Sequence, residues 1–200
     1  RIKKLEDNII AKIAAGEIIE NPSSVIKELM DNCIDAFATN IEIEFHNGGK
    51  DYIRISDNGT GIIYEDLKIA FSRHATSKLN SVNNISTIQS MGFRGEALPS
   101  IATVSNVELI SNISSEGHAG KINLEYGSVL NVKPDVRTKG TTVVVTNLFG
   151  NIPVRRNFLK TTRSEIRKNY DLIKKYILCY PQIKFKVISD GRQYIETSGS

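Results

Sequence analysis

"NPSSVIKELMDNCIDAF", residues 21–37, is the stretch that decides the fold. Asn21 suits the N-cap of a helix and Pro22 suits its first turn. Four acidic or amide side chains recur at intervals of three and four residues, which places them on one helical face. They are Glu28, Asp31, Asn32 and Asp35. The pattern predicts an amphipathic helix over 22–37, whose polar face is either a solvated stripe or one wall of a binding site.

Strands and helices alternate on both sides of this helix. Apolar periodicity over 5–19 predicts a short helix or an ordered arm, and alternation over 41–57 predicts an antiparallel hairpin. Further strands are expected at 105–113, 120–126, 129–134 and 141–148, with a last hairpin turning at Asp190-Gly191. Further helices are expected at 65–71, 96–104, 153–159 and 163–179. The order favours a two-layer α/β sandwich, in which a mixed, mostly antiparallel sheet carries its helices on one face.

Composition bounds the class of protein. The 200 residues suffice for one domain with a buried core, and the start at Arg1 with the TSGS ending favours a piece of a longer chain. A net charge of +4 permits contact with a polyanion without requiring it. No apolar run is long enough to span a bilayer, and no Cys/His cluster has zinc-ligand spacing. Cys33 and Cys179 sit among apolar neighbours, so we expect both to be reduced core residues of an intracellular protein.

Residues 72–95 differ from the rest of the chain, because they are rich in Ser, Asn, Thr and Gly and show weak periodicity. A long irregular segment inside a compact domain is often a functional lid. A disordered insertion is the alternative.

Glycine-bearing turns suggest a nucleotide site. The chain has no GxxxxGK[ST] motif, and Gly59-Thr60-Gly61 lacks the third glycine of a dinucleotide fingerprint. Asp57 ends a predicted strand and can accept a hydrogen bond from an adenine amino group, while the small residues after it let backbone approach the ring. Gly92, Gly95 and the helix start at Glu96 offer backbone N–H groups to phosphate oxygens.

Polar side chains near these turns suit phosphate chemistry. Arg94 or Lys78 can supply positive charge, and Asn32 offers a neutral oxygen to Mg²⁺. Glu28 lies one helical turn before Asn32 and can deprotonate a water molecule. Each residue also has an ordinary interpretation as a turn, a surface amide or a solvated charge. Because the four motifs occur together, they favour a nucleotide site over these ordinary interpretations.

Five motifs in this order resemble the GHKL ATPase superfamily: KELMDNCIDA (27–36), DNGTGI (57–62), RHATSK (73–78), GFRGEAL (92–98) and GTTVVV (140–145). Within it, nearly the whole chain resembles the N-terminal ATPase domain of MutL-type DNA mismatch repair proteins. IAAGEII (13–19) and NLFGNIPVRRNFL (147–159) add to this resemblance. RHATSK with GFRGEAL is the specific part, because gyrase, the heat-shock 90 chaperones and the sensor kinases have different lids.

The resemblance implies a role for each residue of the site and a single GHKL (Bergerat-fold) domain over 1–200, with an arm over 1–20. Glu28 is the general base, and Asn32 coordinates the Mg²⁺ that bridges the phosphates. Asp57 reads the adenine amino group, Gly61 gives the base room, and Thr141 completes the pocket. The remaining residues belong to the ATP lid, 72–95 and the start of the next helix: Thr76, Ser77, Lys78, Arg94, Gly95, Glu96, Ala97 and Leu98.

The resemblance further implies an ATP-driven switch with ATP and Mg²⁺ as cofactors. ATP orders the lid and the arm, and two protomers associate as a homodimer or a paralogue heterodimer. DNA, bound non-specifically through its phosphates, and a MutS-type mismatch recognition protein are the expected partners, with no membrane. The family's catalytic lysine lies in a following transducer domain and its dimerisation domain lies beyond, so we expect hydrolysis by these residues alone to be weak. A bacterial, cytoplasmic protein is favoured, and a nuclear eukaryotic relative is the alternative.

Basic residues late in the chain suggest a second function, that of a DNA-binding module whose nucleotide pocket is vestigial. They are Arg155, Arg156, Lys160, Arg163, Arg167 and Lys168. A solvated helix face tempered by Glu165 is the alternative. In the helix 22–37, we expect Asp35 to be a structural partner near the pocket and Asp31 to be the least committed polar residue.

Overall fold

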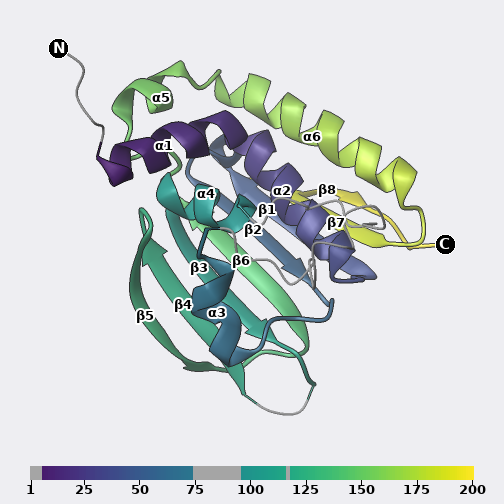
Figure 1. Ribbon diagram of the computed structural model, residues 1–200. Helices are drawn as coiled ribbons and strands as arrows, with labels where there is room; N and C mark the ends of the chain where they lie inside the picture. Colours follow the sequence, from purple (N-terminus) through teal and green to yellow (C-terminus); the bar gives the residue numbers. More distant parts are fainter. Residues whose placement is uncertain (1–5, 74–95, 116–117) are drawn as a thin grey trace, which may run out of the picture.

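An eight-stranded sheet runs through the protein in the computed structural model, which describes residues 6–73, 96–115 and 118–200 (Figure 1). Its strands are β1 (Asn40–His46), β2 (Tyr52–Asp57), β3 (Asn106–Asn112), β4 (Ala119–Glu125), β5 (Ser128–Asp135), β6 (Gly140–Thr146), β7 (Lys184–Ser189) and β8 (Arg192–Glu196). They lie in the order β5-β4-β3-β6-β2-β1-β7-β8. Neighbours pair antiparallel throughout the described sheet, except that β1 and β7 are parallel.

The helices gather on one face of this sheet (Figure 1). They are α1 (Asp7–Ile18), α2 (Pro22–Asp35), α3 (Leu67–Ala70), α4 (Ala97–Thr103), α5 (Pro153–Phe158) and α6 (Thr162–Cys179). The described residues also form two 3₁₀ turns: η1 (Asn47–Gly49), between β1 and β2, and η2 (Tyr64–Asp66), directly before α3. The mixed, mostly antiparallel sheet with helices on one face confirms the predicted two-layer α/β sandwich.

Helix α2 begins as its sequence predicts and buries one face in the core. The Asn21 side chain accepts a hydrogen bond from the Ser24 N–H at 3.0 Å, and Pro22 occupies the first turn. Its buried apolar side chains join the same core cluster as the inward residues of β1 and β2. On α2 they are Val25, Ile26, Leu29, Met30 and Cys33. Burial of each large apolar side chain contributes about 1.5–3 kcal/mol, so this face anchors the helix on the sheet.

Helix α6 is attached to the rest of the fold by buried polar bonds as well as by apolar contacts. Thr161 caps its start, because its hydroxyl accepts from the Ser164 N–H at 3.3 Å. Asn169 is fully buried, and its amide donates to the Gly48 carbonyl at 2.9 Å. The side-chain oxygen of Asn169 accepts from the Ser23 hydroxyl at 2.8 Å. These bonds fix α6 against η1 and the first turn of α2.

Two predictions about individual elements need correction. The helix expected over 65–71 is confirmed only for α3, Leu67–Ala70, because a 3₁₀ turn precedes it. Cys33 is buried as expected, but Cys179 is exposed, because it is the last residue of α6 and the helix end there faces solvent. Among the helices described, none is both long and apolar enough to cross a membrane.

Candidate functional site

The site is built where α2 meets the end of β2. Glu28 and Asn32 lie one turn apart on α2, and both side chains are half-buried. Cys33 follows Asn32 and is 3% exposed. Its thiol donates to the Asp57 Oδ2 atom at 3.3 Å. The predicted base, the predicted metal ligand and the strand-terminal carboxylate are therefore carried by two directly bonded elements.

Asp57 is held in a cradle of donors and is 9% exposed. Its Oδ1 atom accepts from the Gly59 N–H at 2.7 Å and from the Thr141 N–H at 3.3 Å. Burial raises the pKa of the Asp57 carboxyl above its ordinary value, while the Gly59 N–H, the Cys33 thiol and the charge of Arg137 act in the opposite direction. Burial also raises the pKa of the Cys33 thiol, so this group remains a hydrogen-bond donor.

Arg137 lies in the loop between β5 and β6 and braces the backbone behind this carboxylate. Its Nη2 atom donates to the Asp57 carbonyl oxygen at 2.7 Å and to the Ser56 hydroxyl at 3.1 Å. Its Nε atom donates to the Thr142 hydroxyl at 3.1 Å. Burial lowers the pKa of the Arg137 guanidinium. The sequence does not reveal this role, because no local motif marks an arginine that bonds across strands.

The turn after β2 brings bare backbone beside Asp57. Gly61 has φ +75°, and a Cβ atom there would lie 2.2 Å from the Asn112 carbonyl oxygen, so only glycine fits. The Thr60 N–H donates to the Ala36 carbonyl at 2.9 Å, which holds the turn against the end of α2. The turn at Gly61 therefore packs directly against the backbone at Asn112 beside Asp57.

Thr141 borders the same place from β6. Its hydroxyl is 2.7 Å from that of Ser111, which also accepts from the Ile62 N–H at 2.8 Å. Thr141 itself is half-buried. The structure therefore brings Asp57, Gly61 and Thr141 together as the sequence predicts.

The segment expected to wrap phosphates is only partly described. Glu96 is the N-cap of α4, Ala97 and Leu98 form its first turn, and the Glu96 carbonyl accepts from the Ser100 N–H at 2.9 Å. The other predicted lid residues lie outside the described residues: Thr76, Ser77, Lys78, Arg94 and Gly95.

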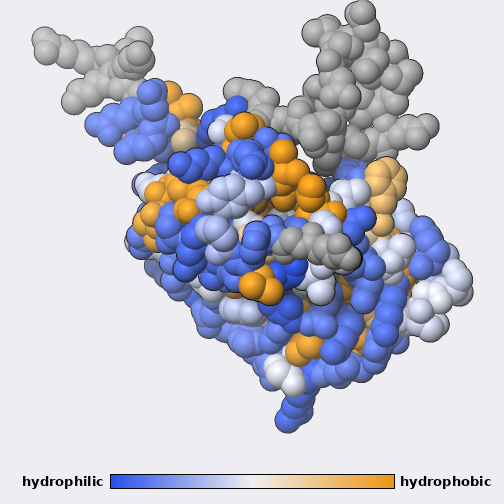
Figure 2. All heavy atoms as spheres, turned by 90° about the horizontal axis from the view of Figure 1, so that it is seen from below, coloured by the Kyte–Doolittle hydropathy of each residue, from blue (hydrophilic) through white to orange (hydrophobic). Residues whose placement is uncertain are grey.

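Exposed apolar side chains flank the turn that leads from β2 to α3. Ile63 and Tyr64 are each 40% exposed, and Ile69 is 55% exposed. On the face seen in Figure 2, apolar side chains form several separate groups within a mostly hydrophilic surface.

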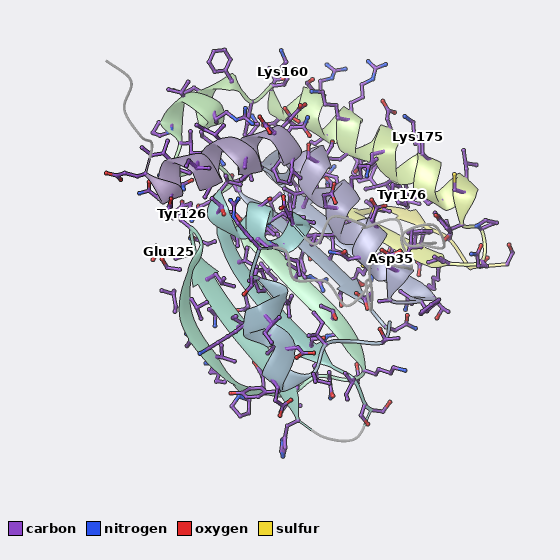
Figure 3. The ribbon with its side chains drawn as sticks, in the orientation of Figure 1. Asp35, Glu125, Tyr126, Lys160, Lys175 and Tyr176 are labelled. Carbon is purple, nitrogen blue, oxygen red and sulfur yellow. The ribbon has the colours of Figure 1, made fainter. Side chains whose placement is uncertain are left out.

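Asp31 contradicts its expected role, because it is the most buried polar residue of α2, at 1% exposed. The Tyr176 hydroxyl donates to its Oδ1 atom at 2.5 Å, and Lys27 donates to its Oδ2 atom at 2.9 Å. Figure 3 shows Tyr176 on the side of α6 that faces α2, and Asp35 near the end of α2. Burial, with the bond to Asp31, raises the pKa of Tyr176 far above its ordinary range.

The described residues alone do not form a set of ligands that encloses a metal ion. No three His, Cys, Asp or Glu side chains of the described segments come close enough to hold an ion. Mg²⁺ usually takes one or two protein oxygens and completes its shell with waters and phosphate oxygens. The half-buried Asn32 amide beside Glu28 fits that pattern.

Arg155, predicted to contact DNA, bonds within the protein. Its Nη2 atom donates to the carbonyl oxygens of Gly16 at 2.6 Å and Ile19 at 3.1 Å. Its guanidinium lies 5.3 Å from the centre of the Phe149 ring. This arginine therefore fastens the end of α1.

Arg156 is engaged in the same way. It donates to the carbonyl oxygens of Lys50 at 2.5 Å and Leu148 at 3.0 Å, and it pairs with the Asp51 carboxylate at 2.6 Å. Hydrogen bonding to Asn47 and Arg156 lowers the pKa of Asp51 even though burial acts to raise it. Arg155 and Arg156 of the predicted DNA patch are thus half-buried structural groups.

The remaining basic residues of the patch are exposed on and before α6: Lys160, Arg163, Arg167 and Lys168. Lys174 and Lys175 extend this exposed group along the helix. Figure 3 shows Lys160 and Lys175 projecting on the side opposite to Tyr176.

Sequence comparison finds relatives over the whole chain. Residues 19–145 match the family described as histidine kinase-, DNA gyrase B-, and HSP90-like ATPase. The chain is 44% identical over 199 residues to the DNA mismatch repair protein MutL of Halothermothrix orenii, and the match covers 100% of this chain and 31% of that protein. It is 44% identical over 200 residues to MutL of Staphylococcus aureus strain Newman, covering 30% of that protein. The chain thus spans about a third of the length of these relatives.

Solved structures share the fold. The Aquifex aeolicus MutL ATPase domain complexed with ADP aligns with a TM-score of 0.77 at 37% identity, covering 92% of this chain and 65% of that chain. The N-terminal domain of a DNA repair protein aligns with a TM-score of 0.79 at 34% identity, covering 94% of this chain and 56% of that one.

Proposed function

The chain belongs to the family of histidine kinase-, DNA gyrase B- and HSP90-like ATPases, among its MutL-type domains, and on that premise we propose that it binds ATP beside α2 and hydrolyses it. One observation carries the proposal. The Asp57 carboxylate is buried at the end of a strand, beside a turn at Gly61 that admits no side chain. A nucleobase that donates an amino hydrogen fits such a place.

The adenine would lie against the turn after β2. Asp57 accepts a hydrogen bond from its 6-amino group, which rejects bases without a donor there. We propose that the turn at Gly61 gives the ring room and that the Thr141 hydroxyl, already close to that of Ser111, borders the pocket.

The phosphates would extend toward the polar face of α2. Glu28 accepts the proton of the attacking water, and the Asn32 oxygen contributes to holding Mg²⁺. The bound ion supplies neutralising charge for the phosphates. Support comes from the spacing of the two side chains, which lie one turn apart and are both half-buried.

We place the phosphate-binding lid over 72–95 and the first turn of α4. Its members are Thr76, Ser77, Lys78, Arg94, Gly95, Glu96, Ala97 and Leu98. Arg73, at the last described position before the gap in this segment, donates to the Ala11 carbonyl at 3.1 Å. Helix α4, which begins after the gap, packs against α1. These contacts support an ATP-driven switch in which the lid and the arm over 1–20 become ordered together. We propose in addition that two protomers then associate.

Full turnover is proposed for the longer protein, because the relatives are about three times as long as this chain. A following transducer domain would supply the catalytic lysine, and a C-terminal domain the permanent dimer. Titration with a non-hydrolysable ATP analogue, with and without Mg²⁺, and a phosphate-release assay test the proposal. Absence of saturable binding at millimolar ATP overturns it.

DNA contact is the second proposed function, and the exposed basic face of α6 favours it. Lys160, Arg163, Arg167 and Lys168 all face solvent, so they can neutralise phosphates without breaking internal bonds. Binding would be non-specific and led by phosphate contacts. We also propose that a MutS-type mismatch recognition protein is a partner, and that the protein acts in a bacterial cytoplasm.

A further inference from the structure

The Asp57 carboxylate keeps one acceptor position beyond its bonds within the protein. A carboxylate oxygen offers about two lone pairs. Oδ1 uses both, on the N–H groups of Gly59 at 2.7 Å and Thr141 at 3.3 Å. Among the contacts of the described residues, Oδ2 accepts the Cys33 thiol alone, at 3.3 Å. The free position on Oδ2 is therefore the one that a ligand can use.

Cys33 determines where that position points. Its thiol occupies one lone pair of Oδ2, and at 3% exposed it cannot be replaced by solvent. The backbone of α2 fixes the sulfur, because Cys33 lies in the last turns of a helix whose end is bonded to the turn at Thr60. Hydrogen bonds to both of its oxygens thus restrain rotation of the Asp57 carboxyl group.

Arg137 restrains the same residue from behind without using its carboxylate. Its Nη2 atom donates to the Asp57 main-chain oxygen at 2.7 Å, and its Nε atom ties it to Thr142 on β6 at 3.1 Å. The Arg137 side chain fits beside Asp57 only because residue 140 is a glycine. A Cβ atom on Gly140 would lie 2.1 Å from the Asp57 carbonyl oxygen and 2.7 Å from Nη1 of Arg137. The strand end is therefore pinned while the acceptor remains available.

We propose that Cys33 and Arg137 are positioning residues that aim Asp57 Oδ2 at the 6-amino group of a purine, and so set the preference of the site for adenine. The inference rests on the proposed ATP site. It assigns the base selectivity to two residues that touch Asp57 rather than to Asp57 alone.

The experiment compares the dissociation constants of ATP and of purine riboside triphosphate, which lacks the 6-amino group. A hydrogen bond to a charged acceptor is worth about tenfold or more in affinity, so the wild-type protein should prefer ATP by at least about that factor. Cys33→Ala and Arg137→Gln should each reduce this preference several-fold and leave binding of the purine analogue nearly unchanged. Cys33→Ser, which keeps a donor, should restore the preference, and Arg137→Lys should restore it in part.

Arg54→Gln is the matched control. Arg54 lies on β2 like Asp57 and is half-buried, but it pairs with Glu42 and Glu44 instead. This variant should keep the wild-type preference even where it lowers thermal stability. Melting temperatures of all variants separate misfolding from altered selectivity.

The outcomes are distinguishable. Failure of the wild-type protein to bind ATP overturns the proposed ATP site itself. Unchanged preference in folded Cys33→Ala and Arg137→Gln proteins, with tight ATP binding in the wild type, overturns the positioning role alone. Should Arg137→Gln not fold, Arg137→Lys and the two Cys33 variants decide the question in the same way.

Discussion

The Tyr176 hydroxyl donates to the Asp31 carboxylate at 2.5 Å and joins α6 to α2 through a buried hydrogen bond. Asp31 lies on the same helix as Glu28 and Asn32, so this bond holds the wall of the site from behind. Lys27 at 2.9 Å completes the contacts of the carboxylate that the structure describes.

Tyr176→Phe should destabilise the fold by about 1–3 kcal/mol, because it leaves a buried charged acceptor without one of its donors. Urea unfolding measures the change. Tyr194→Phe is the control, since Tyr194 is 60% exposed and its ring contact with Tyr170 would be retained. Equal unfolding midpoints for the two variants would show that the bond contributes nothing.

Glu28→Ala should bind ATP with nearly wild-type affinity and lose about 100-fold or more in phosphate release, because removal of a general base costs about 10²–10⁴. The measurement uses the full-length protein. Glu125→Ala, at an exposed position at the end of β4, should leave both quantities unchanged. Normal turnover by the Glu28 variant would remove this residue from the proposed mechanism.

Asp57→Asn should weaken ATP binding by about tenfold or more and raise the thermal stability of the free protein at pH 7. Burial holds the folded pKa of Asp57 above its unfolded value, so its ionisation lowers stability as pH rises through the folded pKa. The neutral amide avoids that cost. The stability gain should shrink as pH falls toward the unfolded pKa of an aspartate. A lower melting temperature at pH 7 would contradict this sign.

Gly61→Ala should cost clearly more than the ~1 kcal/mol that left-handed backbone imposes on alanine, because its Cβ would lie 2.2 Å from the Asn112 carbonyl. Gly191→Ala is a matched control. Gly191 has φ +76°, close to the +75° of Gly61, and nothing lies within 4 Å of its Cβ position. The difference between the two unfolding free energies isolates the steric clash, and a difference near zero would mean that the turn can shift.

Arg163→Ala with Arg167→Ala should weaken DNA binding and lower the slope of log affinity against log salt by about 0.9 for each phosphate that the double variant no longer neutralises. Arg192→Ala, at an exposed position on β8, is the control substitution. Arg155→Ala should instead lower stability, because its guanidinium holds the end of α1. An unchanged salt slope in the double variant would exclude this face of α6.

Local signals explain which parts of this protein the sequence predicts. The cap at Asn21 and the alternation over 41–57 lie within a few residues of the structures that they specify. One donor of the cradle around Asp57 also follows from a short motif, since the Gly59 N–H comes two residues after it, whereas Thr141 and Cys33 are distant in sequence.

Interactions between distant segments could not be predicted in this way. Asp31 resembles a surface residue until Tyr176, 145 residues later, is placed beside it. Arg155 resembles a DNA-binding residue because nothing near it in sequence announces its bonds to Gly16 and Ile19. Periodicity describes one element at a time, whereas these roles depend on which elements become neighbours.

The parallel pairing of β1 with β7 has a consequence for biosynthesis. Asn40 is paired with Lys184, so one edge of β1 stays unpaired until nearly all of these residues have left the ribosome. At about 5–20 residues per second, β1 waits roughly 7–30 s for this second neighbour. During that interval α2 also lacks its contacts with α6, including the bond from the Tyr176 hydroxyl to Asp31. A nascent chain that ends before Tyr176 would therefore carry the proposed site on a helix that α6 does not yet support.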